Sequence, residues 1–290
     1  MEISDKCAIV IGGGNGIGRA IALAIAQKGG RVVVADYDMR AAEGVSDRIA
    51  ADGGIARAFE VDVADYSSVQ ALAEFTWELH GRGDILVNCA GVLQPAAPLL
   101  ETSIAEYEWV FSVNVGGTLN ALRAIGGRMV AGSTPAWIVN TGSEHSFGVP
   151  HKSGGLYTAS KHAVLGLTDV LARELPKHVG ISILCPGLVA TTLCRSSERR
   201  QAAFGGAQMQ PADGGQLMNM GMQADKVADC VLRGIEREDF YILTHPQVIE
   251  YAEARWRAIE SAFASQAPRY EGDDKYTVRH LINKLRAAID

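Results

Sequence analysis

The sequence lacks a long uncharged hydrophobic run, closely spaced cysteines and an excess of basic residues. No apolar stretch approaches the roughly 18 residues of a membrane-spanning helix, and Glu2, Asp5 and Lys6 interrupt any secretory signal at the N-terminus. The five cysteines are far apart, which argues against a disulfide framework and a zinc site. A formal net charge of −6 argues against nucleic acid or an anionic membrane as the main partner. We therefore expect a cytoplasmic protein.

Glycine is abundant, whereas the rest of the composition is ordinary for a globular chain. Hydrophobic residues make up 48% and charged residues 21% of the 290 residues, which excludes a disordered chain. The 32 glycines are about 11% of the chain, against a typical usage of roughly 7%. The fold therefore needs backbone freedom or close backbone approach at some positions.

Short β-branched runs alternate with longer helical patterns. Strands are predicted over 7–11, 31–35, 56–61, 84–88, 136–140, 180–185 and 240–243. Helices are predicted over 20–28, 39–51, 67–79, 157–175 and 225–237, with further helical patterns over 247–265 and 275–288. Apolar strands that alternate with helices imply a parallel sheet covered on both faces. Right-handed crossovers then give a doubly wound, Rossmann-type α/β fold with three layers.

The sequence contains no internal repeat and no sharp domain boundary. Residues 195–224 are rich in Gly, Gln and Met and have no clear period. We therefore predict a single domain over 1–290, with a core at 1–190, a loose segment at 191–224 and a helical C-terminal extension at 245–290.

A glycine-rich turn follows the first predicted strand and opens the first helix. It reads Gly12-Gly13-Gly14-Asn15-Gly16-Ile17-Gly18. A dinucleotide pyrophosphate needs backbone N–H groups at a helix N-terminus and no Cβ atom in the way, and such a turn supplies both. The turn therefore predicts a dinucleotide site.

Asp36 follows the second predicted strand, at the position where a carboxylate meets the adenosine ribose. The carboxylate accepts hydrogen bonds from the ribose hydroxyls and repels a 2′-phosphate. Asn15 is uncharged and does not offset that repulsion, although Arg40 lies nearby in the sequence. These residues favour NAD over NADP.

Tyr157 and Lys161 lie four residues apart on the predicted helix 157–175, so that they share one face. A phenol with a pKa near 10 is a poor base at pH 7, but a neighbouring ammonium favours the phenolate. Tyr-x-x-x-Lys is common by chance, so its meaning depends on the other motifs of the chain.

Taken together, the motifs resemble the classical short-chain dehydrogenases/reductases in order and spacing. The resemblance covers residues 5–192 closely and 225–243 more loosely. The motifs are Gly12-x-x-x-Gly16-x-Gly18, Asp62-Val63, Asn88-Cys89-Ala90-Gly91, Asn114, Ser143, Tyr157-x-x-x-Lys161 and Pro186-Gly187-Leu188-Val189-Ala190-Thr191.

The resemblance implies a role for each of four catalytic residues. Tyr157 exchanges a proton with the substrate oxygen, and Lys161 lowers its pKa and binds the nicotinamide ribose. Ser143 hydrogen-bonds the substrate oxygen, and Asn114 holds a water of the proton relay. Ser146 is an alternative to Ser143, which we prefer because Thr141-Gly142-Ser143 directly follows a predicted strand.

The resemblance also implies a cofactor-binding set. Asp62 contacts the adenine, Asn88 to Gly91 line the cofactor and steady the central strand, and Val189 and Thr191 fix the carboxamide. The whole set is Gly12, Asn15, Gly16, Ile17, Gly18, Asp36, Asp62, Val63, Asn88, Ala90, Gly91, Tyr157, Lys161, Pro186, Gly187, Val189 and Thr191. The sequence departs from the family at Ile11 (usually Thr), Cys89 and Cys185 (usually Asn), which are all supporting positions.

The segment 191–224 corresponds to the substrate lid of the family, and its composition suits a mobile apolar cover. Its apolar residues favour an apolar or aromatic substrate: Leu193, Phe204, Met209, Leu217 and Met218. Glu144, His145 and His151 lie close to Ser143 in the sequence, and we expect them to be pocket-lining or solvated loop residues rather than metal ligands.

We therefore predict an NAD-dependent alcohol dehydrogenase or carbonyl reductase, which transfers a hydride between nicotinamide and a secondary alcohol or ketone. The alternatives are an epimerase or dehydratase of the same family and a catalytically silent NAD(H)-sensing protein. The resemblance implies a homodimer or homotetramer, and large apolar residues beyond residue 244 are expected to pack on the substrate pocket or on another subunit.

Overall fold

The computed structural model describes residues 1–209 and 215–287, and its contacts divide the chain into two compact units. Met1–Val248 contains the sheet, and Ile249–Asp290 contains the helical C-terminal extension. Residues 210–214 of the predicted loose segment and 288–290 of the predicted extension lie outside the described residues.

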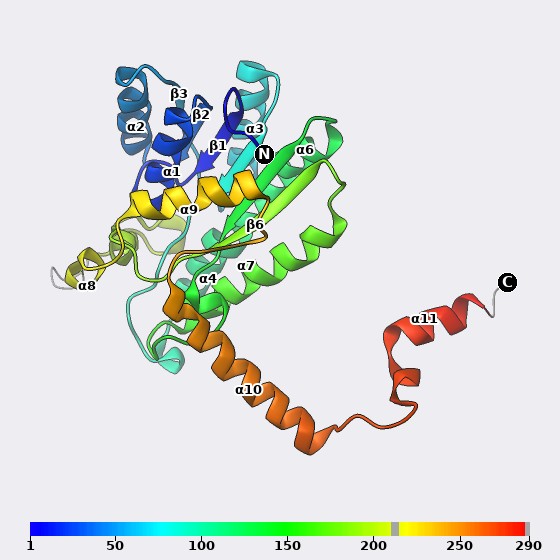
Figure 1. Ribbon diagram of the computed structural model, residues 1–290. Helices are drawn as coiled ribbons and strands as arrows, with labels where there is room; N and C mark the ends of the chain where they lie inside the picture. Colours follow the sequence, from blue (N-terminus) through cyan, green and yellow to red (C-terminus); the bar gives the residue numbers. More distant parts are fainter. Residues whose placement is uncertain (210–214, 288–290) are drawn as a thin grey trace. The chain divides into compact units, whose positions relative to one another are not determined.

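In the described part of the chain, seven parallel strands form one sheet in the order β3-β2-β1-β4-β5-β6-β7 (Figure 1). The strands are β1 (Cys7–Ile11), β2 (Arg31–Asp36), β3 (Ile55–Glu60), β4 (Ile85–Asn88), β5 (Ala136–Thr141), β6 (Val179–Cys185) and β7 (Tyr241–Leu243). Each predicted strand is present, with ends that differ by at most one residue. Strand order reverses between β1 and β4, and in such sheets ligands bind beyond the carboxyl ends of the strands at this point.

Helices cover both faces of the sheet and complete the predicted three layers (Figure 1). One face carries α1 (Gly16–Gln27), α2 (Met39–Ala51) and α9 (Ala224–Arg237). The other face carries α3 (Tyr66–His80), α4 (Ile104–Phe111), α5 (Gly117–Ala121), α6 (Gly127–Ala131) and α7 (Gly155–Glu174). Because successive strand residues point to opposite faces, Ala8 and Val10 pack in the first core and Ile9 and Ile11 in the second.

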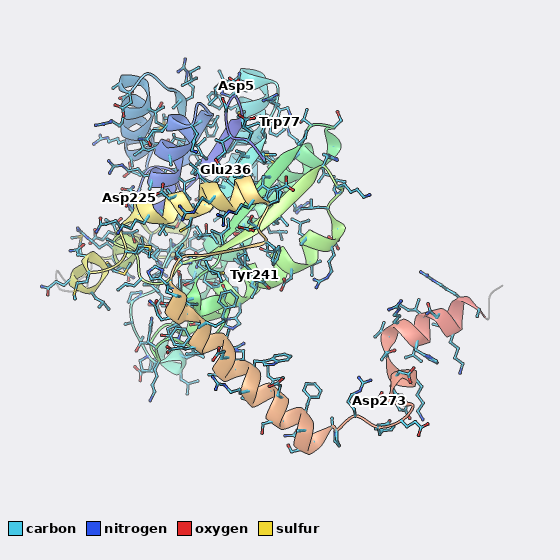
Figure 2. All side chains as sticks on the ribbon, viewed as in Figure 1. Asp5, Trp77, Asp225, Glu236, Tyr241 and Asp273 are labelled. Atoms are coloured by element: carbon cyan, nitrogen blue, oxygen red, sulfur yellow. The ribbon has the colours of Figure 1, made fainter. Side chains whose placement is uncertain are left out.

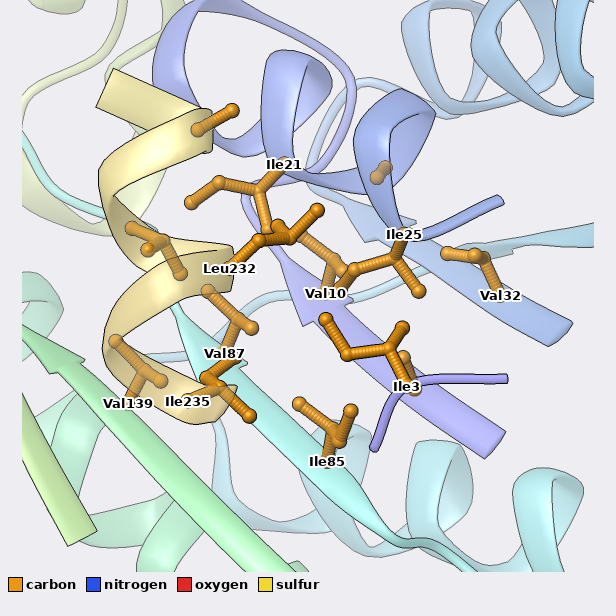
Figure 3. Close-up of a cluster of buried hydrophobic side chains, with 14 of the residues drawn as sticks. Ile3, Val10, Ile21, Ile25, Val32, Ile85, Val87, Val139, Leu232 and Ile235 are labelled. Atoms are coloured by element: carbon orange, nitrogen blue, oxygen red, sulfur yellow. The ribbon is translucent and has the colours of Figure 1, made fainter. Parts of the chain in front are cut away.

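The first core is packed by side chains of α1, α9 and the central strands. Ile21 and Ile25 of α1 belong to the same buried cluster as Leu232 and Ile235 of α9 and Val10 of β1 (Figure 3). Burying a side chain of this size contributes about 1.5–3 kcal/mol relative to leaving it exposed. This packing joins α9 to the N-terminal half of the sheet, although the two segments are about 200 residues apart.

Polar contacts at the surface reinforce the same junction. The amino group of Met1 donates to the carbonyl oxygen of Ile235 at 3.0 Å. The Lys28 ammonium pairs at 3.3 Å with Glu236 of α9, which is labelled in Figure 2. An exposed ion pair of this kind adds little stability, so the apolar core decides the position of α9.

The helical segment between β4 and β5 runs through residues 104–131 and contains two π turns, at Ser112–Gly116 and Leu122–Gly126. Ser103 begins it with a capping box, in which Ser103 and Glu106 each satisfy a backbone N–H group of the other. The first π turn carries Asn114. Such turns are frequent at functional sites because they re-aim side chains.

The C-terminal unit contains α10 (Ile249–Gln266) and α11 (Val278–Arg286). Both begin later than predicted, because 3-10 turns occupy Pro246–Val248 and Asp273–Tyr276. Within this unit, the described residues of α10 and α11 include no buried side chain. Among the described helices, none combines the length and the apolar character that a membrane-spanning helix requires.

Candidate active site

The glycine-rich turn between β1 and α1 is packed so tightly that side chains are excluded. Gly12 has φ +77°, and a Cβ atom on it would lie 2.6 Å from the nitrogen of Ala90. A Cβ atom on Gly18 would lie 2.1 Å from the carbonyl oxygen of Gly12. The N-terminus of α1 thus faces the cavity described below through backbone alone, which suits a pyrophosphate.

Asp36 lies at the end of β2, and its carboxylate is held by the backbone. The N–H of Gly14 donates to Oδ2 at 2.9 Å, and the N–H of Asp38 donates to Oδ1 at 3.0 Å. The side chain lines the cavity beside the glycine turn. A fixed carboxylate at this place is an acceptor for ribose hydroxyls.

Tyr157 and Lys161 lie in the first turns of α7 and are 8% and 4% exposed. The Lys161 ammonium donates to the carbonyl oxygen of Thr141 at 2.8 Å. It lies 5.5 Å from the centre of the Tyr157 ring. The predicted pairing of phenol and ammonium on one helix face is therefore present.

The pKa of Tyr157 is shifted upward, whereas the neighbouring ammonium alone predicts a downward shift. Burial raises it to about 12, the hydrogen bond with Ser143 lowers it, and the carboxylate of Glu144 raises it further. Burial also lowers the pKa of Lys161 to about 8. Both shifts follow from the cost of a charge in a dry environment. The phenol is therefore protonated at neutral pH and is a proton donor in this state.

The two candidate serines have different environments. Ser143 lines the cavity and hydrogen-bonds Tyr157. The hydroxyl of Ser146 donates to the carbonyl oxygen of Lys161 at 2.9 Å and accepts from the N–H of Ser143 at 3.2 Å. Ser146 thus holds the backbone of the site together, and the geometry favours Ser143 as the residue that meets a substrate oxygen.

Asn114 connects the first π turn to α7. Its Oδ1 accepts from the N–H of Val92 at 2.8 Å, and its Nδ2 donates to Ser160 at 3.0 Å. Ser160 in turn donates to the carbonyl oxygen of Tyr157. Asn114 does not itself line the cavity, so a role in a proton relay remains a prediction.

One cavity of about 640 Å³ brings most of the predicted site together. It is lined by Gly12, Asn15, Gly16, Ile17, Gly18, Asp36, Asp62, Val63, Ala90, Gly91, Ser143, Tyr157, Lys161, Pro186, Gly187, Val189 and Thr191. Asn88 is outside the lining, because its amide donates to Asn140 at 2.8 Å and joins β4 to β5. Asn88 therefore supports the central strands, and the structure does not place it against a cofactor.

The residues that depart from the family pattern are apolar or neutral here. Ile11 is 1% exposed. Burial raises the pKa of Cys89 and raises that of Cys185 to about 12, so that both are thiols at neutral pH. All five cysteines are free. Ile11 and Cys89 line the cavity described above, and supporting roles for these three positions stay a prediction.

The lid segment contributes some of its predicted apolar residues to the cavity. Leu193, Leu217 and Met218 line it. Phe204 instead packs against the core beneath the sheet, and Met209 is 83% exposed. The contribution of the lid to the apolar lining is therefore smaller than the sequence predicts.

Gln201 joins the lid to the cofactor side of the cavity, a role that the sequence analysis missed. Its Nε2 donates to Oδ1 of Asp62 at 3.0 Å, and its Oε1 accepts from the indole N–H of Trp109 at 3.1 Å. The two partners are 139 and 92 residues away along the chain. No local signal marks such a residue.

His245 was also missed, and it braces the loop after β6. Its Nδ1 accepts from the N–H of Gly187 at 3.1 Å, and its Nε2 lies 3.0 Å from the carbonyl oxygen of Leu188. Both contacts require a neutral imidazole that carries its proton on Nε2. Gly187 and Leu188 line the cavity, so His245 holds part of its wall in place.

Glu144, His145 and His151 line the cavity as predicted. The ring of His145 contacts those of His151 and Tyr157 edge-on, with centroids 4.8 and 5.1 Å apart. Burial lowers the pKa of His145 to about 4, so this ring is neutral. Among the described residues, no group of three His, Cys, Asp or Glu side chains is placed to hold a metal ion.

The model of the family described as short chain dehydrogenase matches residues 6–202. The chain belongs to this family. The match confirms the family assignment, which the glycine turn and the Ser143–Tyr157–Lys161 set of this short-chain dehydrogenase had indicated. The parallel sheet agrees with the fold of the family. The members of this family are oxidoreductases that bind a nicotinamide cofactor.

Two curated proteins are similar to this chain in sequence. A Mycobacterium tuberculosis protein named "Probable oxidoreductase EphD" is 35% identical over 241 residues, which are 81% of this chain and 40% of that protein. The chain thus spans well under two thirds of that relative's length. The D-threitol dehydrogenase of Mycolicibacterium smegmatis is 38% identical over 193 residues, 66% of this chain and 73% of that enzyme.

Solved structures of the family share the fold. A Burkholderia phymatum short chain dehydrogenase/reductase in complex with NAD has a TM-score of 0.85 and 34% identity, over 93% of this chain and 99% of that one. A metagenomic short-chain oxidoreductase in complex with NADP has a TM-score of 0.68 and 28% identity, over 85% and 99%. Structural likeness alone therefore does not choose between the two cofactors.

Proposed function

We propose that this short-chain dehydrogenase is an NAD-dependent alcohol dehydrogenase or carbonyl reductase that acts on a secondary alcohol or ketone. One observation carries the proposal: Ser143, Tyr157 and Lys161 line the same cavity as the glycine turn and Asp36. An acid/base group and a dinucleotide site in one cavity are the two requirements of hydride transfer to or from a carbonyl carbon.

The bound nicotinamide supplies or accepts the hydride, and the protein supplies position and a proton. Ser143 and Tyr157 offer two hydrogen bonds to one substrate oxygen. In reduction the protonated phenol of Tyr157 donates its proton to the developing alkoxide. In oxidation the phenolate accepts the proton of the alcohol, and the Lys161 ammonium stabilises that phenolate.

The preference for NAD rests on Asp36. Two backbone N–H groups hold its carboxylate, which lines the cavity. There it would accept hydrogen bonds from the ribose hydroxyls of NAD and repel the 2′-phosphate of NADP. Asn15 is uncharged, and Arg40 lies on the exposed side of α2. The NAD complex of the Burkholderia phymatum relative is consistent with this preference, and the NADP complex of the metagenomic relative shows that the family allows the alternative.

A spectrophotometric screen tests the proposed reaction. Purified protein is mixed with NAD⁺ or NADP⁺ and a panel of secondary alcohols, and absorbance is followed at about 340 nm, where reduced nicotinamide absorbs. We expect NADH to accumulate with at least one alcohol. Conversion of an alcohol without net NADH would indicate an epimerase or dehydratase. NADH binding without any turnover would favour a silent sensor.

We further propose a homodimer or homotetramer that works in the cytoplasm. The α7 helix carries apolar side chains beyond those that the sheet covers: Val170 is 54% exposed. In α11, Val278, Leu281, Ile282 and Leu285 recur at the spacing of one helix face. Apolar faces of this kind favour a partner surface, such as a second subunit.

A further inference from the structure

Glu144 lies on the cavity wall directly beside the catalytic serine. It follows Ser143 at the start of the short 3-10 turn Glu144–Ser146, just after β5. Burial raises the pKa of its carboxyl group. Its negative charge also raises the pKa of Tyr157, so the carboxylate and the phenol interact electrostatically. Glu144 is thus close to the reacting position without belonging to the Ser143–Tyr157–Lys161 set.

The carboxylate of Glu144 has no counter-charge and no hydrogen-bond donor among the described residues. The backbone of Glu144 is bonded to Pro186, and its Oε2 lies toward Gly187, where a Cβ atom would come within 3.2 Å of it. Glu144 is half-buried, and its carboxylate oxygens are not among the fully buried atoms that lack a partner. A ligand that enters the cavity can therefore offer a hydrogen-bond donor to them.

A second polar group on the same cavity wall is similarly incomplete. Gln94 is 2% exposed, and its Oε1 accepts from the backbone N–H of Tyr157 at 3.2 Å. This bond fixes the orientation of the amide. Its Nε2 is buried without a partner among the described residues. A carboxylate acceptor and an amide donor therefore line the same cavity as Tyr157, and a purely apolar substrate would use neither of them.

We propose that Glu144 determines specificity by accepting a hydrogen bond from a second hydroxyl group of the substrate. The substrate class is then neutral diols and polyols and the corresponding hydroxyketones. The inference rests on the proposed dehydrogenase function and replaces the apolar or aromatic substrate that the lid composition predicts. A substrate carboxylate is disfavoured by charge repulsion, and a simple alcohol leaves the carboxylate unpaired.

Matched substrate pairs test the proposal. The kcat/KM values for butane-2,3-diol and butan-2-ol, and for cyclohexane-1,2-diol and cyclohexanol, are measured in the wild type, Glu144→Gln and Glu144→Leu. Glu108→Gln is the control, because it removes the same charge from an exposed position on α4. We expect the wild type and Glu108→Gln to prefer each diol by about tenfold or more, the effect of one hydrogen bond to a charged acceptor. Glu144→Leu should bring both ratios close to one, and Glu144→Gln should give intermediate ratios.

Each other outcome has a definite meaning. A wild type that oxidises the simple alcohols as well as the diols, or a ratio that Glu144→Leu leaves unchanged, overturns the role of Glu144 while the dehydrogenase function stands. A preference for 1-aminopropan-2-ol or lactate over the diols overturns the substrate class. If no alcohol or ketone is turned over although NADH binds, the proposed function fails and the inference fails with it. Glu144→Gln is nearly isosteric, so the test survives if Glu144→Leu does not fold.

Discussion

Two walls of the cavity are built in different ways: the cofactor wall of the glycine turn and Asp36, and the substrate wall of Gln94, Glu144 and His145, both named for their proposed ligands. On the cofactor wall, Gly12 directly follows β1 and Asp36 ends β2, and backbone N–H groups at most 22 positions away hold the Asp36 carboxylate. On the substrate wall, Gln94 bonds to a residue 63 positions away, and His245 holds a loop 58 positions away. A strand–turn–helix unit specifies the first wall locally, whereas packing between distant loops specifies the second. Substrate choice can therefore change while cofactor binding is kept.

The sharpest test of this division is at Tyr157, where the two walls meet. Tyr157→Phe removes the proton donor and keeps the ring, so kcat should fall by about 10²–10⁴-fold while the Kd for NADH changes little. Stopped-flow kinetics and NADH fluorescence titration measure the two quantities. Lys161→Ala should lose activity and also weaken NADH binding. A Tyr157→Phe enzyme with more than about a tenth of the wild-type kcat would contradict the assignment.

Burial of His145 on the substrate wall should also make the free energy of unfolding depend on pH. The pKa of His145 is lowered to about 4, whereas an unfolded histidine has a pKa near 6.5. The unfolded chain therefore binds the proton more strongly, and stability is lost as pH falls from about 6.5 toward 4. Between pH 7 and pH 5 this amounts to about 2 kcal/mol.

Urea unfolding at both pH values measures that loss in wild type, His145→Gln and the exposed control His280→Gln. His145→Gln should lose less stability on acidification than the wild type, and the control should match the wild type. Equal losses in all three proteins would show that His145 is not buried as a neutral ring.

On the cofactor wall, Asp36→Ala should change cofactor choice and leave substrate choice unchanged. Removing the repulsive carboxylate should lower the NAD⁺/NADP⁺ ratio of kcat/KM by at least about tenfold. Asp47→Ala removes a charge from the exposed side of α2 and should leave the ratio as it is. A wild type that uses both cofactors equally would contradict the role of Asp36 from the outset.

The His245 contact should connect the two walls, because the loop that it holds lines the nicotinamide end of the predicted cofactor site. His245→Ala removes the acceptor of the Gly187 N–H, so the KM for NAD⁺ should rise about threefold to tenfold with a smaller change in kcat. His245→Asn keeps an acceptor oxygen and should recover part of the loss. A variant that only lowers the melting temperature would indicate a structural role instead.

The smallest effect is expected from the C-terminal extension. Truncation after Ala267 should alter the substrate KM or the oligomer mass more than it alters cofactor affinity, because the cofactor wall lies wholly within residues 1–248. Steady-state kinetics and light scattering measure these quantities. An unchanged oligomer with unchanged kinetics would remove the extension from both the pocket and the interface.

The strand predictions were accurate because parallel strands of a doubly wound sheet are buried on both faces and read as continuous apolar runs, as in Ile9 to Ile11 and Val32 to Val34. The predicted starts of the last two helices were wrong, because their first residues form separate 3-10 turns. The amide of Asn88 joins two strands, as the family resemblance implies, and its contact with the cofactor stays a prediction.

The amino-acid sequence by itself determined the sheet, the glycine turn, the position of Asp36 and the pairing of Tyr157 with Lys161. Each follows from spacing within one strand–turn–helix unit, where backbone geometry repeats from protein to protein. Only the tertiary structure decided that burial raises the pKa of Tyr157, that His245 braces Gly187 and that Glu144 lines the cavity with no described residue paired to its carboxylate. These properties depend on which distant segments exclude water and supply donors, and no periodicity along the chain encodes that.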